Sequence, residues 1–323
     1  DVMHHADVYL LIVTASIPFI ALYNGGAAVF RAMGNSEVSM KVSLLMNAIN
    51  VSGNAILIYG FHCGTEGVAI PTLVSRFVAA FIIIKLLLKD KWSLHLERTF
   101  RFNPDWSMIR KILSVGIPNG LENSMFQLGK VLVLSLVSTF GTYAIAANAV
   151  SNVITLFSIL PGQAICLAVT TVIARCVGAG DYEQAKYYNK KLILLTHIGM
   201  VITIFIVFIT LPFILKVYNL SEAASEATRH IIWFHGFCAI LIWAESFTLP
   251  ATFRACGDAK ACMIISTVSM WIFRVGASYI LGKNLGLGVF GVWVAMIIDW
   301  TFRSLLFGIR YFSGKWKKHA LVS

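Results

Sequence analysis

Residues 30–35 read Phe30-Arg31-Ala32-Met33-Gly34-Asn35, and residues 253–258 repeat them as Phe253-Arg254-Ala255-Cys256-Gly257-Asp258. The two copies lie 223 residues apart, and the match continues to Gly67, which returns as Gly291 after one inserted residue. Each copy follows one apolar run and precedes two more. A repeat of this length decides the fold, because it identifies a duplicated unit. Duplicated sets of apolar helices are typical of transporters made of two related halves.

The composition indicates a membrane protein. The chain has 323 residues, of which 58% are hydrophobic and only 13% charged, whereas soluble domains carry about 25% charged residues. Many apolar runs reach the roughly 20 residues needed to cross ~30 Å of hydrocarbon. We therefore predict an all-α polytopic membrane protein with about nine spans, at roughly 9–29, 38–60, 67–88, 112–139, 143–174, 191–215, 228–251, 261–282 and 288–311.

The basic residues predict the orientation of these spans. Of the 26 Lys and Arg residues, 19 fall in one set of loops and 3 in the opposite set. Because basic loops stay in the cytoplasm, the repeated loops and the C-terminus are expected on the cytoplasmic side. The membrane itself is expected to be the cell (inner) membrane. This pattern also accounts for the net charge of +11 without a nucleic-acid partner. The six cysteines form no CxxC pair, and the histidines have no metal-binding spacing, so no metal site is predicted.

A hydrophilic stretch divides the chain. We predict an N-terminal bundle at 1–90, a cytoplasmic linker at 91–111, a C-terminal six-helix bundle at 112–312 and a cytoplasmic tail at 313–323. The repeat aligns the first three spans with the last three. Two pseudo-symmetric bundles of six helices would make twelve in a complete protein. We therefore expect this chain to be a fragment that lacks the first three helices.

The two repeated arginines are expected to be structural. Arg31 and Arg254 each precede a glycine, Gly34 or Gly257, near the end of an apolar run. A basic residue at a helix C-terminus complements the helix dipole, and glycine permits the tight turn that follows. We interpret both arginines as parts of cytoplasmic turns rather than as substrate ligands.

Charged side chains inside the predicted spans each need a reason, because an ionised group at the bilayer centre costs about 2.5–3.5 kcal/mol on insertion scales. Asp299 and Arg303 are four residues apart and share a helix face. They are expected either to form a local ion pair or to leave Asp299 free to pair with Arg274. The remaining charged residues in spans are Arg76, Glu122, Lys130 and Glu245.

Glu122 belongs to a polar stripe that follows Pro118. A proline bends a membrane helix, which is common where a cavity forms. The stripe is interpreted as either a cavity wall or a structural feature, and its other members are Asn119, Asn123 and Gln127. Lys130 lies eight residues after Glu122, about 12 Å along a helix, so it needs a partner on a neighbouring helix or a hydrated cavity.

Glu245 has no charged residue within four positions. A carboxyl group without a charged neighbour in a span is expected to hold its proton readily. This behaviour suits a proton-coupling group, and a protonated Glu that donates to a backbone carbonyl is the alternative.

The order of the motifs resembles that of the multidrug and toxic compound extrusion (MATE) family, in its bacterial branch that includes the DinF-like transporters. The motifs that carry the resemblance, beside the repeated turns, are 50–54, 57–60, 67–69, 116–118, 141–147 and 176–181. The resemblance implies two six-helix bundles around a central cavity. It also implies a monomer that exports organic cations or amphipathic drugs by alternating access, driven by Na⁺ or H⁺ and without any other cofactor.

The resemblance also implies coupling residues. The family's first-half cation site matches Asn50, Asn54 and Thr72, whose alternative role is interhelical hydrogen bonding. Glu122 and Glu245 fall on the helices that carry acidic coupling residues in the second half of the family. The Asp that the family contributes from its first helix would lie before residue 1.

The sequence argues against two other functions. A lipid-linked precursor flippase of the same superfamily would favour a strongly cationic cavity. Here the basic residues within spans are roughly offset by Glu122, Glu245 and Asp299, so efflux is preferred. An enzyme would need a clustered catalytic set or a nucleotide motif, and the sequence contains neither. The energy source is therefore expected to be an ion gradient.

Overall fold

The computed structural model describes residues 2–97 and 104–319, which divide into two units, Asp1–Asn103 and Pro104–Ser323. The predicted linker at 91–111 is therefore described only in part, since residues 98–103 lie outside the described ranges. The same holds for residues 320–323 of the predicted tail.

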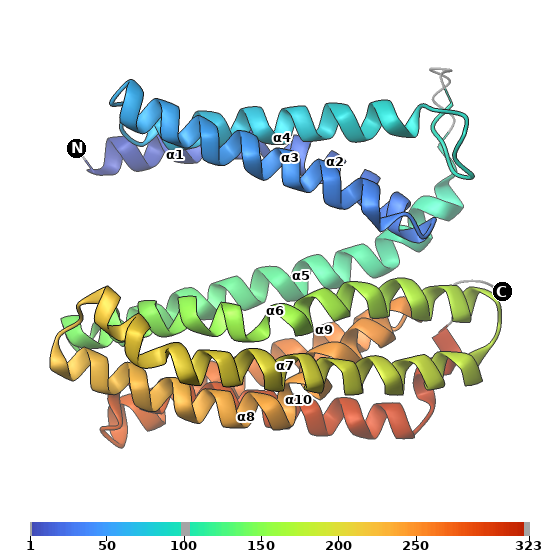
Figure 1. The fold of residues 1–323 in the computed structure, drawn as a ribbon. Coiled ribbons are helices and arrows are strands. Elements are labelled where there is room, and N and C mark those ends of the chain that lie inside the picture. The colour runs from blue at the N-terminus through green and yellow to red at the C-terminus, as the bar shows by residue number, and fades with distance from the viewer. Residues whose placement is uncertain (1, 98–103, 320–323) are drawn as a thin grey trace. The chain divides into compact units, whose positions relative to one another are not determined.

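The N-terminal unit is made of helices that pack along one another (Figure 1). A core of buried apolar side chains joins α2, α3 and α4, with Phe30 and Ile83 at its centre. The first predicted span is one helical segment that is interrupted at Ser16, two residues before Pro18, and so consists of two helices in series. The Arg76 guanidinium donates to Ser16 Oγ at this break (2.6 Å). The elements are α1 (Val2–Ala15), α2 (Ile17–Ala32), α3 (Ser36–Ala55), the π-helical segment η1 (Ile56–Gly60) and α4 (Glu66–Leu87).

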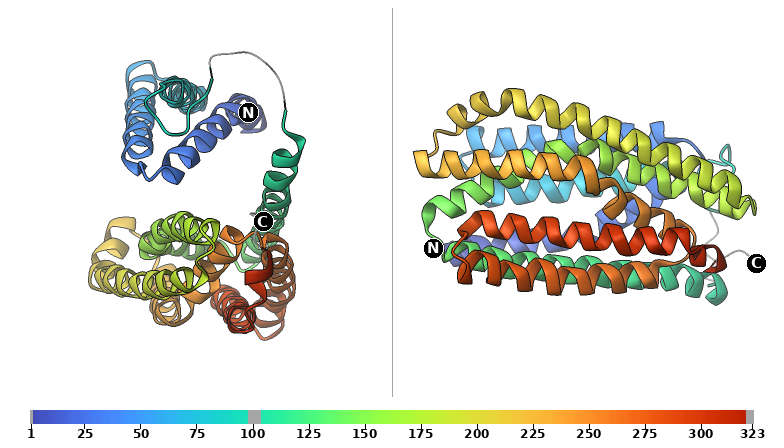
Figure 2. Two further views of the ribbon diagram at one scale, coloured as in Figure 1. Left: turned by 90° about the vertical axis from the view of Figure 1, so that its right-hand side faces the viewer. Right: turned by 90° about the horizontal axis from the view of Figure 1, so that it is seen from below.

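The C-terminal unit contains longer helices that run side by side (Figure 2). Its largest apolar core lies between α5, α6, α7, α8 and α10, where Trp243, Trp293 and Trp300 are almost fully buried. The helices are α5 (Trp106–Ser138), α6 (Thr142–Gly178), α7 (Tyr182–Tyr218), α8 (Glu222–Ala255), α9 (Ala259–Ser269) and α10 (Gly288–Phe312). Two π-helical segments, η2 (Met270–Gly276) and η3 (Tyr279–Asn284), follow α9, and a 3₁₀ turn, η4 (Lys315–His319), follows α10.

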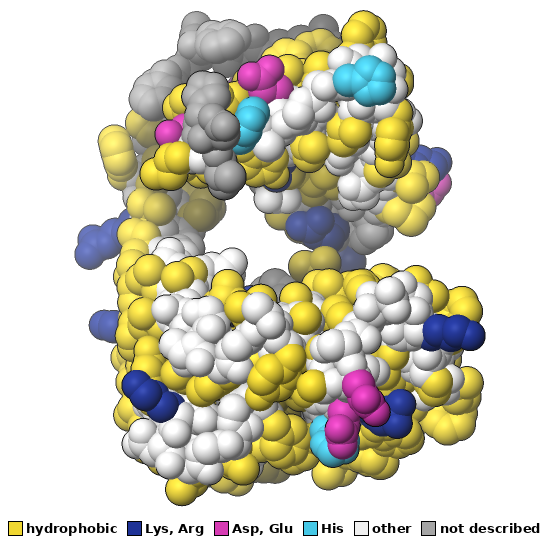
Figure 3. All heavy atoms as spheres, turned by 90° about the vertical axis from the view of Figure 1, so that its left-hand side faces the viewer, with side chains coloured by type: hydrophobic (Ala, Val, Ile, Leu, Met, Phe, Trp, Pro, Cys, Tyr) yellow, Lys and Arg dark blue, Asp and Glu magenta, His cyan; other side chains and the backbone are white. Residues whose placement is uncertain are grey.

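Large apolar side chains are exposed along the helices, as lipid-facing side chains should be, and Phe81, Phe157 and Phe205 are 60%, 60% and 64% exposed. Figure 3 looks onto the ends of the helices, where hydrophobic side chains are mixed with polar groups and a few charged ones. Within the described ranges, eight helical segments are long and apolar enough to cross a membrane. They match eight of the nine predicted spans. The remaining predicted span, at 112–139, is also helical, within α5. It is not among the eight segments, because its polar stripe makes it less apolar than they are.

The repeated stretch forms the same turn in both units. Gly34 and Gly257 have φ angles of 81° and 85°, in the left-handed region that favours glycine. The next residue in each copy donates its N–H to the carbonyl of the repeated phenylalanine, Asn35 to Phe30 (2.9 Å) and Asp258 to Phe253 (2.8 Å). This is a Schellman motif, which satisfies carbonyls that the helix end would leave free. The turns are therefore structural, as the sequence predicts.

The repeat also sets a close contact further along the chain. A Cβ added to Gly67 would meet Cys63 and Leu57 at 3.0 and 3.4 Å, and one added to Gly291 would lie 2.8 Å from the backbone of Leu281. Leu57 and Leu281 lie in η1 and η3, which occupy matching places in the two copies. The repeated glycine thus lets the start of a helix approach a π-helical segment.

Gly291→Ala is expected to destabilise the protein by about 1–3 kcal/mol, because the new methyl group would meet backbone atoms that cannot move aside. Gly308→Ala, in the same helix, is the matched control, since no atom lies within 4 Å of its added Cβ. That variant is expected to be neutral or up to about 1 kcal/mol more stable. Thermal unfolding in detergent measures both. Equal unfolding temperatures for the two variants would contradict the close contact.

Candidate functional site

Three residues expected in the first-half cation site lie together between α3 and α4. Asn50 Nδ2 donates to Thr72 Oγ1 (3.1 Å), and Asn54 Nδ2 donates to Asn50 Oδ1 (3.3 Å). Thr72 donates in turn to the carbonyl of Val68 (2.9 Å). Asn54 Oδ1 is buried and accepts no hydrogen bond. The cluster therefore offers a buried acceptor oxygen, whereas a bound cation needs several oxygen ligands.

Glu122 is paired with the repeated arginine of the second half. The Arg254 Nη2 lies 3.0 Å and 3.1 Å from the two carboxylate oxygens of Glu122, across 132 residues of sequence. The Glu122 side chain is 8% exposed and that of Arg254 is 26% exposed. The interpretation of Arg254 as a turn residue alone is therefore incomplete. Arg31, its copy, has no such ion pair within the described residues.

This ion pair lies on the wall of an open cavity of about 760 Å³ at the surface of the C-terminal unit. The cavity is bounded by α5, α6, α8 and α10, and Arg303 also faces it. Of the polar stripe on α5, Asn119, Glu122 and Asn123 line this cavity. Gln127 is not among its lining residues and is exposed. The N-terminal part of the stripe, Asn119 to Asn123, therefore forms part of the cavity wall.

Asp299 forms neither of the ion pairs that the sequence suggests. Its side chain is fully buried and accepts a hydrogen bond from Ser269 Oγ (2.5 Å), while no arginine lies within 4 Å of it. Neither predicted pair is therefore in direct contact, although both arginines attract the carboxylate over a longer distance. Asp299 Oδ1 accepts from Ser269, on the adjacent helix α9, and Oδ2 is buried without a hydrogen-bond partner among the described residues. The guanidinium of Arg303 instead lies over the ring of Phe247, 4.8 Å from its centre.

Basic side chains gather around one aromatic ring. Lys130, Arg274 and Arg303 lie 5.5, 5.4 and 5.7 Å from the centre of the Phe126 ring. A cation above a ring face is stabilised by the quadrupole of the ring, but its charge is not cancelled. Lys130 and Arg274 have no carboxylate within ion-pair distance in the described part of the chain. No acid of the described spans therefore contacts these two charges directly, although Asp299 attracts Arg274 over a longer distance.

Glu245 is not isolated. His197, on α7, places Nε2 3.0 Å from Glu245 Oε1 on α8, so the expectation of a carboxyl without a partner is wrong. His197 Nδ1 lies 2.8 Å from the carbonyl oxygen of Ile240. A carbonyl only accepts, so Nδ1 must carry a hydrogen. Nε2 then either accepts from a protonated Glu245 or donates to an ionised one, and in both states one proton lies between the two residues.

The sequence-predicted residues therefore form separate groups. Asn50, Asn54 and Thr72 lie in the N-terminal unit. In the C-terminal unit, Glu122 and Asn123 line one cavity, Lys130 and Arg274 line another, Glu245 joins α7 to α8, and Asp299 is enclosed between α9 and α10. Sequence reasoning missed the partners His197 and Arg254. A histidine in the middle of an apolar run was the available signal for the first.

Comparisons with known proteins agree on one family. The MatE family model matches residues 118–280. The chain is 26% identical over 328 residues to the probable multidrug resistance protein NorM of Thermotoga maritima, covering 100% of this chain and 70% of that protein. It is also 26% identical over 323 residues to the uncharacterized transporter YisQ of Bacillus subtilis, covering 97% and 70% respectively.

Solved structures share the fold. An outward-facing multidrug resistance MATE family transporter of the MOP superfamily superposes with a TM-score of 0.87 at 20% identity, covering 96% of this chain and 70% of that chain. A MATE protein in the straight conformation gives the same TM-score and coverage at 21% identity. The chain thus spans about 70% of the length of these proteins.

Proposed function

The chain belongs to the MATE family of multi-pass membrane transporters, and on that premise we propose that it exports small amphipathic organic compounds, organic cations among them, in exchange for protons. Transport proceeds by alternating access across the cell membrane, and the C-terminus lies in the cytoplasm, as the distribution of basic residues favours. Several relatives are named probable multidrug resistance proteins, which supports efflux of drug-like compounds. Membership of a transporter family gives no support to catalytic activity.

The observation that carries the choice of protons is the Glu245–His197 pair. Its two members come from different membrane helices, and one proton lies between them at 3.0 Å. Movement of α7 against α8 would separate the two groups and change which of them holds the proton. Exchange of a proton with one side of the membrane can in this way be linked to helix movement. Sodium remains the alternative coupling ion, with Asn50, Asn54 and Thr72 as its nearest candidates for ligands.

A flippase for lipid-linked precursors is the second candidate, and one observation favours it. Lys130 and Arg274 line a pocket in which no described lining residue is acidic, as a site for a lipid phosphate would require.

The proposal is tested in a bacterial host that lacks its own multidrug pumps. Cells that express the protein are expected to accumulate several-fold less of a fluorescent amphipathic cation than cells with an empty vector. A protonophore should restore accumulation, whereas removal of Na⁺ should not. Equal accumulation with and without the protein would argue against efflux, and a requirement for Na⁺ would replace the proton as coupling ion.

A further inference from the structure

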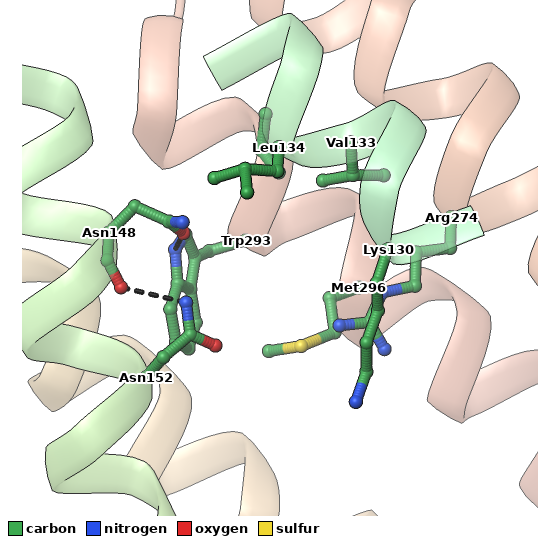
Figure 4. Close-up of a pocket in the computed structure, with 9 residues that line it drawn as sticks. Lys130, Val133, Leu134, Asn148, Asn152, Arg274, Trp293 and Met296 are labelled. Carbon is green, nitrogen blue, oxygen red and sulfur yellow. Dashed lines mark hydrogen bonds between the residues drawn. The ribbon is translucent and has the colours of Figure 1, made fainter. Parts of the chain in front are cut away.

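A pocket of about 240 Å³ opens on the surface of the C-terminal unit, between α5, α6, α10 and η2, and its residues Lys130 and Asn152 are exposed. Figure 4 shows Lys130 and Arg274 together on one side of it and Asn148 and Asn152 on the other, with Met296 between them. Within the described ranges, no acidic side chain lines it. The pocket therefore combines two positive charges, two amides and an apolar floor.

The amide of Asn148 is oriented so that it can donate into this space. Trp293 Nε1 lies 3.2 Å from Asn148 Oδ1, and an indole nitrogen can only donate. The oxygen of Asn148 must therefore face Trp293, which leaves Nδ2 for a ligand. Asn152 Nδ2 already donates to the carbonyl of Asn148 (2.7 Å), so Asn152 offers its Oδ1. The pocket thus presents a neutral donor in addition to its two cations.

The charge of the pocket is balanced only in part by its surroundings. Asp299, on α10, attracts the guanidinium of Arg274, but its carboxylate accepts a hydrogen bond from Ser269 and lies beyond ion-pair distance of Arg274. Among the described residues, no carboxylate lies within ion-pair distance of Lys130. Two cations within a membrane-spanning unit repel one another, and this repulsion is relieved by an anion between them. A guanidinium also offers the paired N–H groups that match a carboxylate or a phosphate.

We propose that this pocket binds the anionic group of the transported compound, a carboxylate or a phosphate carried on an apolar body. Trp293 and Met296 would contact the apolar body, and Lys130 and Arg274 the anionic group. The inference rests on the proposed transport function and narrows its substrates to organic acids and zwitterions in addition to cations. Both a drug-like acid and a lipid phosphate carry this chemistry, and the test separates them.

The test measures binding alone, by equilibrium dialysis of the purified protein in detergent against empty micelles. The probes are naphthalene-2-carboxylate, the uncharged 2-naphthalenemethanol of similar shape, and farnesyl phosphate. The wild-type protein is expected to bind the carboxylate about tenfold more tightly than the alcohol, the ratio that one charge-assisted hydrogen bond gives. Arg274→Gln and Lys130→Gln should each reduce this ratio to near one, with little effect on the alcohol.

Two further variants control for a general loss of positive charge and for misfolding of Arg274→Gln. Lys283→Gln removes one exposed basic residue outside the pocket and should keep the tenfold ratio. Arg274→Lys keeps the charge but loses the paired donors, so it should retain part of the preference even if Arg274→Gln does not fold. Preference for farnesyl phosphate alone assigns the anion to a lipid, and preference for the carboxylate assigns it to a soluble acid. Equal binding of carboxylate and alcohol by the wild-type protein overturns the proposal.

Because dialysis needs no ion gradient, this result is independent of transport. A protein that binds the carboxylate through Arg274 but moves no substrate would contradict the proposed function and leave the pocket standing. A protein that transports substrate but binds the carboxylate and the alcohol equally well would support the proposed function and contradict the proposal for the pocket.

Discussion

Glu245→Gln is expected to reduce gradient-driven transport to the level of empty liposomes while the protein still folds in the membrane. Glutamine cannot release or take up a proton, so the exchange across the Glu245–His197 contact (3.0 Å) is lost. The packing should survive, because the glutamine amide can still donate to His197 Nε2 while His197 Nδ1 donates to Ile240 (2.8 Å). The measurement is substrate movement in proteoliposomes under an imposed proton gradient.

Two controls separate coupling from folding. Glu222→Gln removes an exposed acid at the first turn of the same helix, α8, and should leave transport unchanged. Exchange of labelled for unlabelled substrate without any gradient should persist in Glu245→Gln, since it requires alternating access but no coupled proton. Normal gradient-driven transport by this variant would show that Glu245 does not couple the proton.

The second large effect is expected at the Glu122–Arg254 ion pair. Glu122→Gln leaves the guanidinium of Arg254 without its partner in a mostly buried place, and breaking a buried pair costs about 3–5 kcal/mol. Because Arg254 is 26% exposed in its side chain, we expect a loss near the lower value. Thermal unfolding of the purified protein should show it as a lower unfolding temperature.

A double-mutant cycle isolates the pair. Arg254→Gln should also destabilise, and Glu122→Gln combined with Arg254→Gln should cost less than the sum of the two single changes, because neither charge is then left alone. Glu37→Gln is the matched control. The side chains of Glu37 and Lys41, which form an ion pair, are 66% and 69% exposed, so this substitution should have no measurable effect on the unfolding temperature. Additive losses in the double variant would mean that the two charges do not stabilise one another.

The sequence predicted features that depend on local pattern. Apolar runs set the helices, because a helix in lipid must satisfy its own backbone groups. The repeated turn followed from Gly34 and Gly257, since the chain conformation there needs glycine. In each case the determining residues lie within a few positions of one another.

Features that depend on neighbouring helices were harder to predict. Periodicity indicates which face a residue occupies, but not which residue of another helix lies opposite. His197 is 48 residues from Glu245, and Arg254 is 132 from Glu122, so neither partner follows from spacing. The local rule that pairs Asp299 with Arg303 predicts their attraction but not their geometry, since the carboxylate accepts from Ser269 and the guanidinium lies over the ring of Phe247. The roles of the predicted coupling residues remain predictions.

Transport by the purified protein in proteoliposomes, with Na⁺ and H⁺ gradients imposed separately, tests the central claim most directly. We expect an amphipathic cation to move against its own concentration gradient when protons flow in the opposite direction, and not when Na⁺ alone does. A protonophore should abolish the movement. Absence of uphill movement under either gradient would contradict the account of this chain as an ion-coupled exporter.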